Sequence, residues 1–302
     1  MNAHAARPVL ASNPLPRCLV LVGANDRVHA PQMLPPDPAR AFDIAVWGCG
    51  DLPPANASLR FPALGRLLRD MPSLWQPYDL IWLPDETVQT RGSAVATMCA
   101  LMQAHDLWLA QPSLDWTGPD DELLERHNPA FTLRSTNWVS ERMPCFRREF
   151  LAAVLDSFAL ATGDPGLGHL WAALAPRGRV AVLDGVSLAL TGQQPVRVQS
   201  GADEWSTLHR RALEALGVSD LSCLSWGGVD TAGRVLALHD KATRHAFVGR
   251  LMSGWAAGMD DASALGALLE RHLAASPAEA PQTVPEPVPA RPSLRRSPIL
   301  AA

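Results

Sequence analysis

The stretch Tyr78-Asp79-Leu80-Ile81-Trp82-Leu83-Pro84-Asp85-Glu86-Thr87 decides the fold that we expect for this chain. Four apolar residues form a run that Pro84 ends, and two carboxylates follow at once. This pattern predicts a buried strand whose carboxyl end carries charge, which is where α/β folds bind ligands. Carboxylate oxygens there suit a divalent cation that carries a diphosphate. A solvated turn after a core strand is the alternative interpretation.

Strand and helix patterns alternate around this segment. Short apolar runs predict strands, and apolar residues at helical spacing predict helices. Up to residue 139 the predicted strands are 18–22, 42–47, 80–83, 107–110 and 131–139, and the predicted helices are 59–70 and 93–105. This order is typical of an α/β fold in which helices cover a largely parallel sheet.

The second half of the chain follows a looser pattern. A helix is predicted at 147–158, and a buried strand at 180–183 ends at Asp184. After Gly201 the pattern is mostly helical. The helices predicted there are 204–216, 244–257 and 262–275.

Two proline-rich segments flank the predicted domain. Residues 1–16 are expected to form a flexible arm, and residues 276–302 an extended tail, because proline at this density blocks both helix and sheet. Between them we predict an α/β domain over residues 17–200 and a helical region over residues 201–275. A protein partner bound through the basic end of the tail is one interpretation, and solvated disorder is the other.

Composition excludes several classes of function. The net charge of −4 over 302 residues gives no general electrostatic case for binding nucleic acid or an anionic membrane. No apolar run approaches a membrane-spanning length, and the N-terminus lacks the apolar core of a signal peptide, so we expect a cytoplasmic protein. The 5 cysteines are widely spread and have no paired C-x-x-C spacing, which predicts reduced thiols.

The motif Gly23-Ala24-Asn25-Asp26-Arg27 follows the first predicted strand. It lacks the spaced glycines of a dinucleotide fingerprint and the Lys-Ser/Thr pair of a phosphate loop. Asp26 and Arg27 still follow a strand where a sheet offers its ligand edge, and Arg27 can bind a phosphate through two hydrogen bonds. A structural turn is the alternative interpretation.

Several further blocks of sequence occur in the order seen in one family. The blocks are Arg17-Cys18-Leu19-Val20-Leu21-Val22, Phe42-Asp43-Ile44-Ala45-Val46, the Tyr78 to Glu86 segment, Leu109-Ala110-Gln111-Pro112-Ser113-Leu114, Leu133-Arg134-Ser135-Thr136-Asn137-Trp138-Val139, Met143-Pro144-Cys145-Phe146, Gly166-Leu167-Gly168-His169-Leu170-Trp171 and Val182-Leu183-Asp184-Gly185-Val186. Through them the chain resembles the DUF707 family, whose uncharacterised members look like nucleotide-diphospho-sugar transferases of the GT-A type. The resemblance covers about residues 17–198.

The resemblance implies a GT-A-like, mostly parallel mixed sheet with a nucleotide-sugar site at one edge. Asp26, Arg27, Asp85 and Glu86 would form that site, and Asp85 would contact the ribose or hold Mn²⁺ or Mg²⁺. A metal ion there would neutralise charge on the leaving nucleotide. A second carboxylate often deprotonates the acceptor hydroxyl, so the implied partners are a nucleotide-diphospho-sugar and a glycan or other hydroxyl acceptor.

The chain departs from the family pattern at three polar positions. Thr87 stands where the last, metal-bearing carboxylate is expected, which weakens the case for a metal ion. His169 replaces a candidate base, and residues 190–196 lack the His and Arg that the family carries after Asp184. Asp184 and His169 are the candidate catalytic residues, since Asp184 ends a strand and a histidine accepts a proton near neutral pH. A core or capping role is the alternative for His169.

Two functions follow from these expectations. The first is a glycosyltransferase that moves a sugar from a nucleotide-diphospho-sugar to an acceptor. The second is a non-catalytic relative that kept the fold and serves as a binding or scaffold protein. A hydrolase that uses the same metal site is a third hypothesis.

Overall fold

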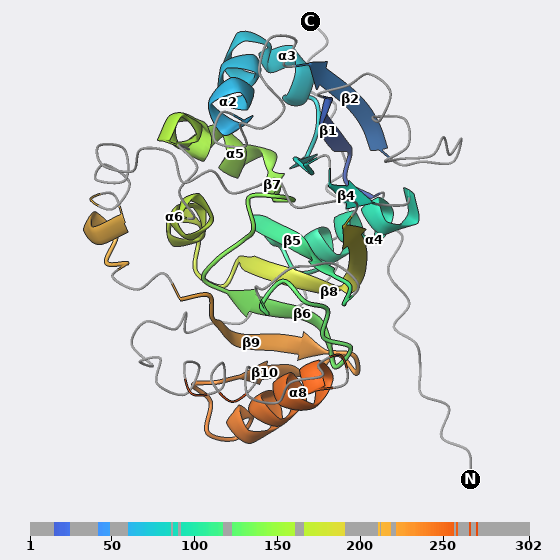
Figure 1. The fold of residues 1–302 in the computed structure, drawn as a ribbon, viewed down its shortest axis with the longest axis vertical. Helices are drawn as coiled ribbons and strands as arrows, with labels where there is room; N and C mark the ends of the chain where they lie inside the picture. Colours follow the sequence, from blue (N-terminus) through green and yellow to red (C-terminus); the bar gives the residue numbers. More distant parts are fainter. Residues whose placement is uncertain are drawn as a thin grey trace, which may run out of the picture.

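One ten-stranded sheet runs through the computed structural model of the chain, with helices on both of its faces (Figure 1). The described residues are 15–24, 42–48, 60–85, 87–89, 92–116, 123–160, 166–190, 211, 213–218, 222–256, 258, 266 and 270. None of the helices in these ranges has both the length and the apolar character needed to cross a membrane.

The strands and helices have the following bounds. The strands are β1 (Cys18–Ala24), β2 (Phe42–Gly48), β3 (Leu80–Trp82), β4 (Val88–Gln89), β5 (Leu109–Leu114), β6 (Phe131–Thr136), β7 (Cys145–Arg147), β8 (Val180–Leu190), β9 (Ser225–Asp230) and β10 (Val235–Ala237). The helices are α2 (Arg60–Asp70), α3 (Pro72–Trp75), α4 (Gly92–Ala104), α5 (Arg148–Val154), the 3₁₀ helix η2 (Leu155–Leu160), α6 (Leu167–Leu174) and α8 (Arg244–Ala256).

The strand order is β10-β9-β6-β8-β5-β7-β3-β1-β2, with β4 paired to β8. Strands β2, β1 and β3 are parallel to one another, and β5 is parallel to β8. Strand β7 lies antiparallel between β3 and β5, and β6, β9 and β10 extend the sheet with antiparallel ladders. The carboxyl ends of β1, β2, β3, β5 and β8 therefore meet at one edge, which we call the carboxyl edge.

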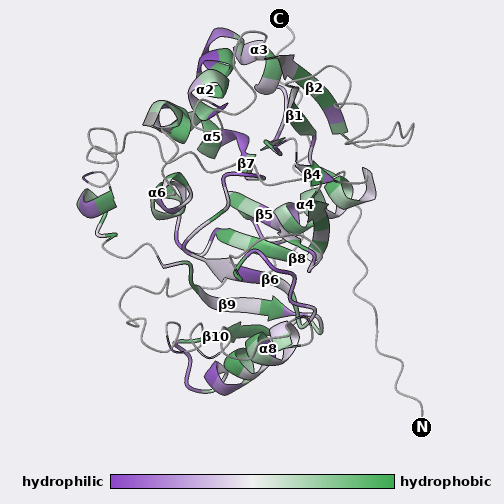
Figure 2. Cartoon of the chain, in the orientation of Figure 1, coloured by the Kyte–Doolittle hydropathy of each residue, from purple (hydrophilic) through white to green (hydrophobic). Residues whose placement is uncertain are grey.

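The core lies on both faces of this sheet. On one face the even-numbered residues of β1, such as Val20, pack with Met98 and Met102 of α4. On the other face the odd-numbered residues, such as Leu21, pack with side chains of α2, α5, η2 and α6. Both faces of β1 are thus apolar, which explains the continuous run in the sequence, and Figure 2 shows the hydrophobic colour along β5 and β8 at the centre of the sheet.

A separate apolar cluster closes the β10 end of the sheet. Helix α8 packs on β9 and β10, and its Phe247 and Trp255 are fully buried against residues such as Phe131 and Trp226 (Figure 1). The α8 stripe has helical spacing, since Phe247, Leu251 and Trp255 are four residues apart.

A bulge interrupts β8 at the carboxyl edge. Pro112 of β5 pairs with Leu183 of β8, but Ser113 pairs with Ser187, so residues 184–186 leave the ladder. Such a bulge re-aims side chains out of the regular alternation. Beyond it, the end of β8 pairs with the short β4, so it lies beside the loop that follows β3.

The α/β class is confirmed, and strands occur close to each of the positions predicted before residue 190. The region after Gly201 contains α8 as predicted, but it also supplies strands β9 and β10, so the expectation of a mostly helical region is corrected there. Their sequences, Ser225-Trp226-Gly227-Gly228-Val229-Asp230 and Val235-Leu236-Ala237, are short or rich in glycine and carry a weak strand signal. Most of the predicted helices 204–216 and 262–275, residues 1–14 of the arm and the tail 276–302 lie outside the described residues.

Candidate functional site

Asp85 lies at the carboxyl edge, directly after β3. Beyond Trp82 the chain continues antiparallel to the segment that precedes β7, because Leu83 N donates to the Pro144 carbonyl (3.0 Å) and Asp85 N donates to the Arg142 carbonyl (2.6 Å). These two hydrogen bonds carry the β3–β7 ladder past the end of the strand. They fix the backbone of Asp85, whose exposed fraction is 9 %.

Thr87 holds the Asp85 carboxylate in a local turn. Asp85 Oδ1 accepts hydrogen bonds from Thr87 N (2.9 Å) and Thr87 Oγ1 (2.6 Å). Asp is favoured at such positions because its side chain can accept from the backbone two residues on. No described residue donates a hydrogen bond to Asp85 Oδ2. Thr87 thus orients the Asp85 carboxylate, whereas the family pattern has a further carboxylate at this position.

Arg60 and Glu141 tie the surrounding elements to the end of β3. The Arg60 guanidinium, at the start of α2, donates to the carbonyls of Glu141 (2.6 Å) and Leu83 (2.5 Å). The Glu141 carboxylate accepts from Leu167 N (3.1 Å) at the start of α6, where an anion is favoured by the helix dipole. Sequence reasoning missed both residues, since neither stands in a recognisable motif.

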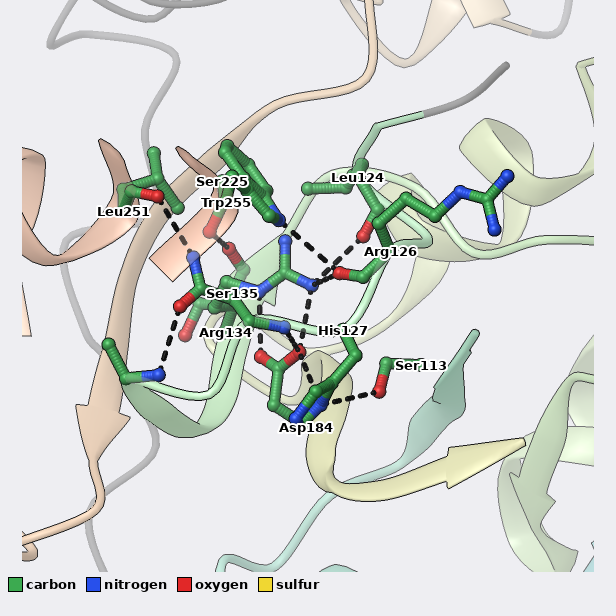
Figure 3. A network of polar contacts seen from close by, with 12 residues as sticks. Ser113, Leu124, Arg126, His127, Arg134, Ser135, Asp184, Ser225, Leu251 and Trp255 are labelled. Carbon is green, nitrogen blue, oxygen red and sulfur yellow. Dashed lines mark hydrogen bonds and ion pairs between the residues drawn. The ribbon is translucent and has the colours of Figure 1, made fainter. Parts of the chain in front are cut away.

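Asp184 lies in the β8 bulge and is buried in an ion pair (Figure 3). Its Oδ2 is 2.7 Å from Arg134 Nε, and its Oδ1 accepts from Arg134 Nη2 (3.0 Å) and Asn128 N (2.8 Å). Both side chains of the pair are fully shielded from solvent. The carboxylate expected as a base or ligand is therefore engaged by a cation within the core.

Arg134 extends the same network toward α8. Its Nη2 also donates to the carbonyls of Leu124 (3.0 Å) and Arg126 (2.9 Å), and its guanidinium lies 5.0 Å from the Trp255 ring centroid. A buried charge needs paired partners of this kind. The network joins β6, β8, α8 and the segment before β6.

His127 stands beside Asp184 and is partly exposed (Figure 3). Its Nδ1 is 3.4 Å from Ser113 Oγ and 4.0 Å from Asp184 Oδ1, and 30 % of its side chain is accessible to solvent. Its backbone N donates to the carbonyl of Leu114 at the end of β5 (2.7 Å). Sequence reasoning missed His127, because it lies in no predicted element and only the fold brings it to Asp184.

His169 lies on α6 within the core. It is 2 % exposed, its Nε2 is 4.0 Å from Cys223 Sγ, and its ring centroid is 6.3 Å from that of Trp138. The preceding Gly168 allows this packing, because an added Cβ there would lie 1.9 Å from the Val139 carbonyl oxygen. These contacts fit the core interpretation of His169.

The structure does not bring the predicted site residues into one cluster. No hydrogen bond or ion pair joins any two of Asp85, His169 and Asp184 in the described ranges. Asp26, Arg27 and Glu86 lie outside those ranges. Within them, no group of three or more His, Cys, Asp or Glu side chains is arranged to hold a metal ion. The described donors around Asp85 therefore do not fit a metal site by themselves.

Comparisons with known proteins add little. No family model matches the chain, and no curated protein matches its sequence. Among solved structures, the chain is similar to the crystal structure of A197 from STIV. The TM-score is 0.31 at 10 % identity, over 59 % of this chain and 86 % of that one.

Proposed function

We propose that this protein is a glycosyltransferase that binds a nucleotide-diphospho-sugar at the carboxyl edge of its sheet. The observation that carries the proposal is the position of Asp85, which a fixed backbone and the Thr87 turn hold beyond three parallel strands. Ligands of open α/β sheets bind outside the carboxyl ends of parallel strands. The ordered blocks of sequence that resemble the DUF707 family support the same substrate class.

Asp85 is the residue to which we assign the nucleotide. Its Oδ1 is engaged by Thr87, which leaves Oδ2 as an acceptor for a ribose hydroxyl. Asp26 and Arg27 follow β1 in the sequence, and β1 is the parallel neighbour of β3, so we propose that these two residues contribute to the same site. A guanidinium such as that of Arg27 suits the diphosphate because it binds two oxygens at once.

A divalent cation is a separate proposal. The resemblance implies Mn²⁺ or Mg²⁺ with Asp85 as a ligand, but the described donors do not make such a site. We therefore assign no step of the reaction to a metal ion. Whether the cation contributes is measured directly, by comparing donor binding in the presence of manganese and of a chelator.

A non-catalytic binding protein is the second candidate. The burial of Asp184 against Arg134 and the burial of His169 favour it, because both candidate catalytic residues make contacts typical of a core. The same nucleotide-sugar site would then serve recognition alone. The two candidates differ in turnover and not in binding.

Calorimetric titration with UDP-glucose, UDP-N-acetylglucosamine and GDP-mannose tests the proposal. We expect at least one donor to bind the wild-type protein and Asp85→Asn to weaken it about tenfold or more, since Asn keeps the acceptor for Thr87 but loses the charge. The matched control is Asp156→Ala, which removes an exposed carboxylate on η2. Absence of binding for every donor at millimolar concentration contradicts both candidates, whereas binding without release of nucleoside diphosphate favours the second.

A further inference from the structure

The buried ion pair leaves the proposed transfer without the base that the sequence suggests. Asp184 accepts three hydrogen bonds and its side chain is fully shielded, so an acceptor hydroxyl cannot reach it. The reaction nevertheless has to remove a proton from the acceptor. Among the described residues, His127 is the titratable side chain that contacts Asp184 and is also open to solvent.

We propose that His127 is the general base of the transfer, an inference that rests on the proposed glycosyltransferase function. In the transfer, His127 Nε2 takes the proton of the acceptor hydroxyl while the acceptor oxygen bonds to the anomeric carbon of the donor. The bond from that carbon to the diphosphate oxygen breaks, and the nucleoside diphosphate leaves with the electron pair. Every proton and electron pair is thereby accounted for without a further reactant.

The hydrogen bonds of Ser113 determine which nitrogen of His127 is basic. The Ser113 hydroxyl has one hydrogen, and it donates that hydrogen to the Val186 carbonyl (3.1 Å). Toward His127 Nδ1, at 3.4 Å, Ser113 Oγ can therefore only accept. Nδ1 carries the proton, and Nε2 keeps a lone pair, for which no described residue is a hydrogen-bond partner.

The β8 bulge creates this arrangement. It removes residues 184–186 from pairing with β5, which frees the Val186 carbonyl for Ser113 and turns Asp184 toward His127. Asp184 Oδ1 lies 4.0 Å from His127 Nδ1, and Arg134 holds the Asp184 carboxylate in that position. Asp184 thus acts through His127 as a positioning residue.

The spacing along the carboxyl edge allows one donor to place its nucleotide at Asp85 and its sugar near His127. Ser113 lies at the carboxyl end of β5, and Asp85 follows the carboxyl end of β3, with β7 between them. Two interstrand spacings amount to roughly 10 Å. A donor whose nucleotide lies at Asp85 would therefore direct its sugar along the edge toward His127.

His127→Asn tests the role, because the Asn side-chain amide can replace the Nδ1 donor but has no counterpart of Nε2. We expect the rate of nucleoside diphosphate release, measured with water or a panel of free sugars as the acceptor, to fall about 100-fold or more. Donor affinity measured by calorimetry should stay within about twofold, because the ring does not contact the nucleotide. The control is His245→Asn, an exposed histidine on α8, and near-UV circular dichroism verifies folding of both variants.

The outcomes separate this inference from the proposed function. A wild-type protein that binds no donor contradicts the function itself. Donor binding without turnover contradicts the assignment of His127 as general base and leaves a binding protein. A turnover rate that changes less than about threefold in His127→Asn contradicts that assignment alone.

A second measurement needs no variant of His127. Long-range ¹H–¹⁵N spectra should identify the Nδ1–H tautomer of His127 in the wild-type protein, and Ser113→Ala should shift the ring toward the Nε2–H tautomer. An Nε2–H tautomer in the wild-type protein overturns the inference.

Discussion

The two ends of the sheet place their charges differently. At the β2-β1-β3 end the strands are parallel, β1 and β3 are apolar on both faces, and the carboxylate of Asp85 follows β3 at the edge. At the β6-β9-β10 end the strands are antiparallel, and Arg134 and Asp184 are buried beside them. The Asp85 carboxylate accepts hydrogen bonds from the adjacent Thr87, whereas the fully shielded Asp184 carboxylate is paired with a cation. Similar sequence patterns, an apolar run that ends in Asp, therefore lead to different roles.

Removal of the buried cation should have the largest effect. Arg134→Met leaves Asp184 buried without a counter-charge, so we expect the free energy of unfolding to fall by about 3–5 kcal/mol. Urea denaturation measures the change. The double variant Arg134→Met/Asp184→Leu should lose less, because it removes both charges.

Arg148→Met is the control for this comparison. Arg148 pairs with Glu149 at 2.6 Å, but both side chains are exposed, so the loss should stay below about 1 kcal/mol. Equal losses for Arg134→Met and Arg148→Met would mean that burial does not distinguish the two ends.

A glycine in β9 supplies the next largest effect. An added Cβ at Gly228 would lie 2.5 Å from the Leu133 carbonyl oxygen, so Gly228→Ala must displace backbone between β6 and β9. We expect a loss of about 1–3 kcal/mol in the free energy of unfolding. Gly249→Ala on α8 meets no atom within 4 Å and should instead stabilise the protein by about 0.5–1 kcal/mol. A neutral Gly228→Ala would contradict the close approach of the two strands.

The same contrast explains what the sequence could predict. The buried strands of the parallel end can be predicted from runs such as Leu80 to Leu83, because both faces of such a strand are buried and the apolar pattern is continuous. Strand β9 is hard to predict, because Gly227 and Gly228 carry little strand propensity, and Gly228 allows a close approach to β6 that no local pattern indicates. The same holds for His127, whose place beside Asp184 depends on a bulge that no local pattern specifies.

The edge at Asp85 should tolerate change better than the interior. Thr87→Val removes the 2.6 Å hydrogen bond to Asp85 Oδ1 but leaves the Thr87 backbone donor, so we expect a loss of about 1 kcal/mol in the free energy of unfolding. Donor affinity should fall as well, since the carboxylate loses one of its two anchors. Thr97→Val on α4, where the hydroxyl donates to the Ser93 carbonyl, is the control that should leave donor affinity unchanged.

Three buried thiols beneath the parallel end supply the smallest effect. A hydrogen bond with Cys18 raises the pKa of the Cys99 thiol, and a hydrogen bond with Cys145 raises the pKa of the Cys18 thiol. Burial raises the pKa of Cys145. Cys223 is a fourth free cysteine among the described residues.

These thiols should make the parallel end sensitive to alkali. The pKa values of the three thiols are raised in the folded state above the ordinary value of 9.0. The contribution of the neutral thiols to the free energy of unfolding is therefore fully present below that pH. It is lost as the pH rises, because the unfolded chain ionises first. Each thiol then costs about 0.4 kcal/mol of the free energy of unfolding between about pH 7 and about pH 9. Cys99→Ala should shrink the difference between the two pH values by that amount, and comparing each protein with itself cancels the packing lost on truncation. If the stability difference between the two pH values is as large in Cys99→Ala as in the wild-type protein, Cys99 ionises in the folded state as readily as in the unfolded chain. That result would contradict the burial of Cys99 on α4.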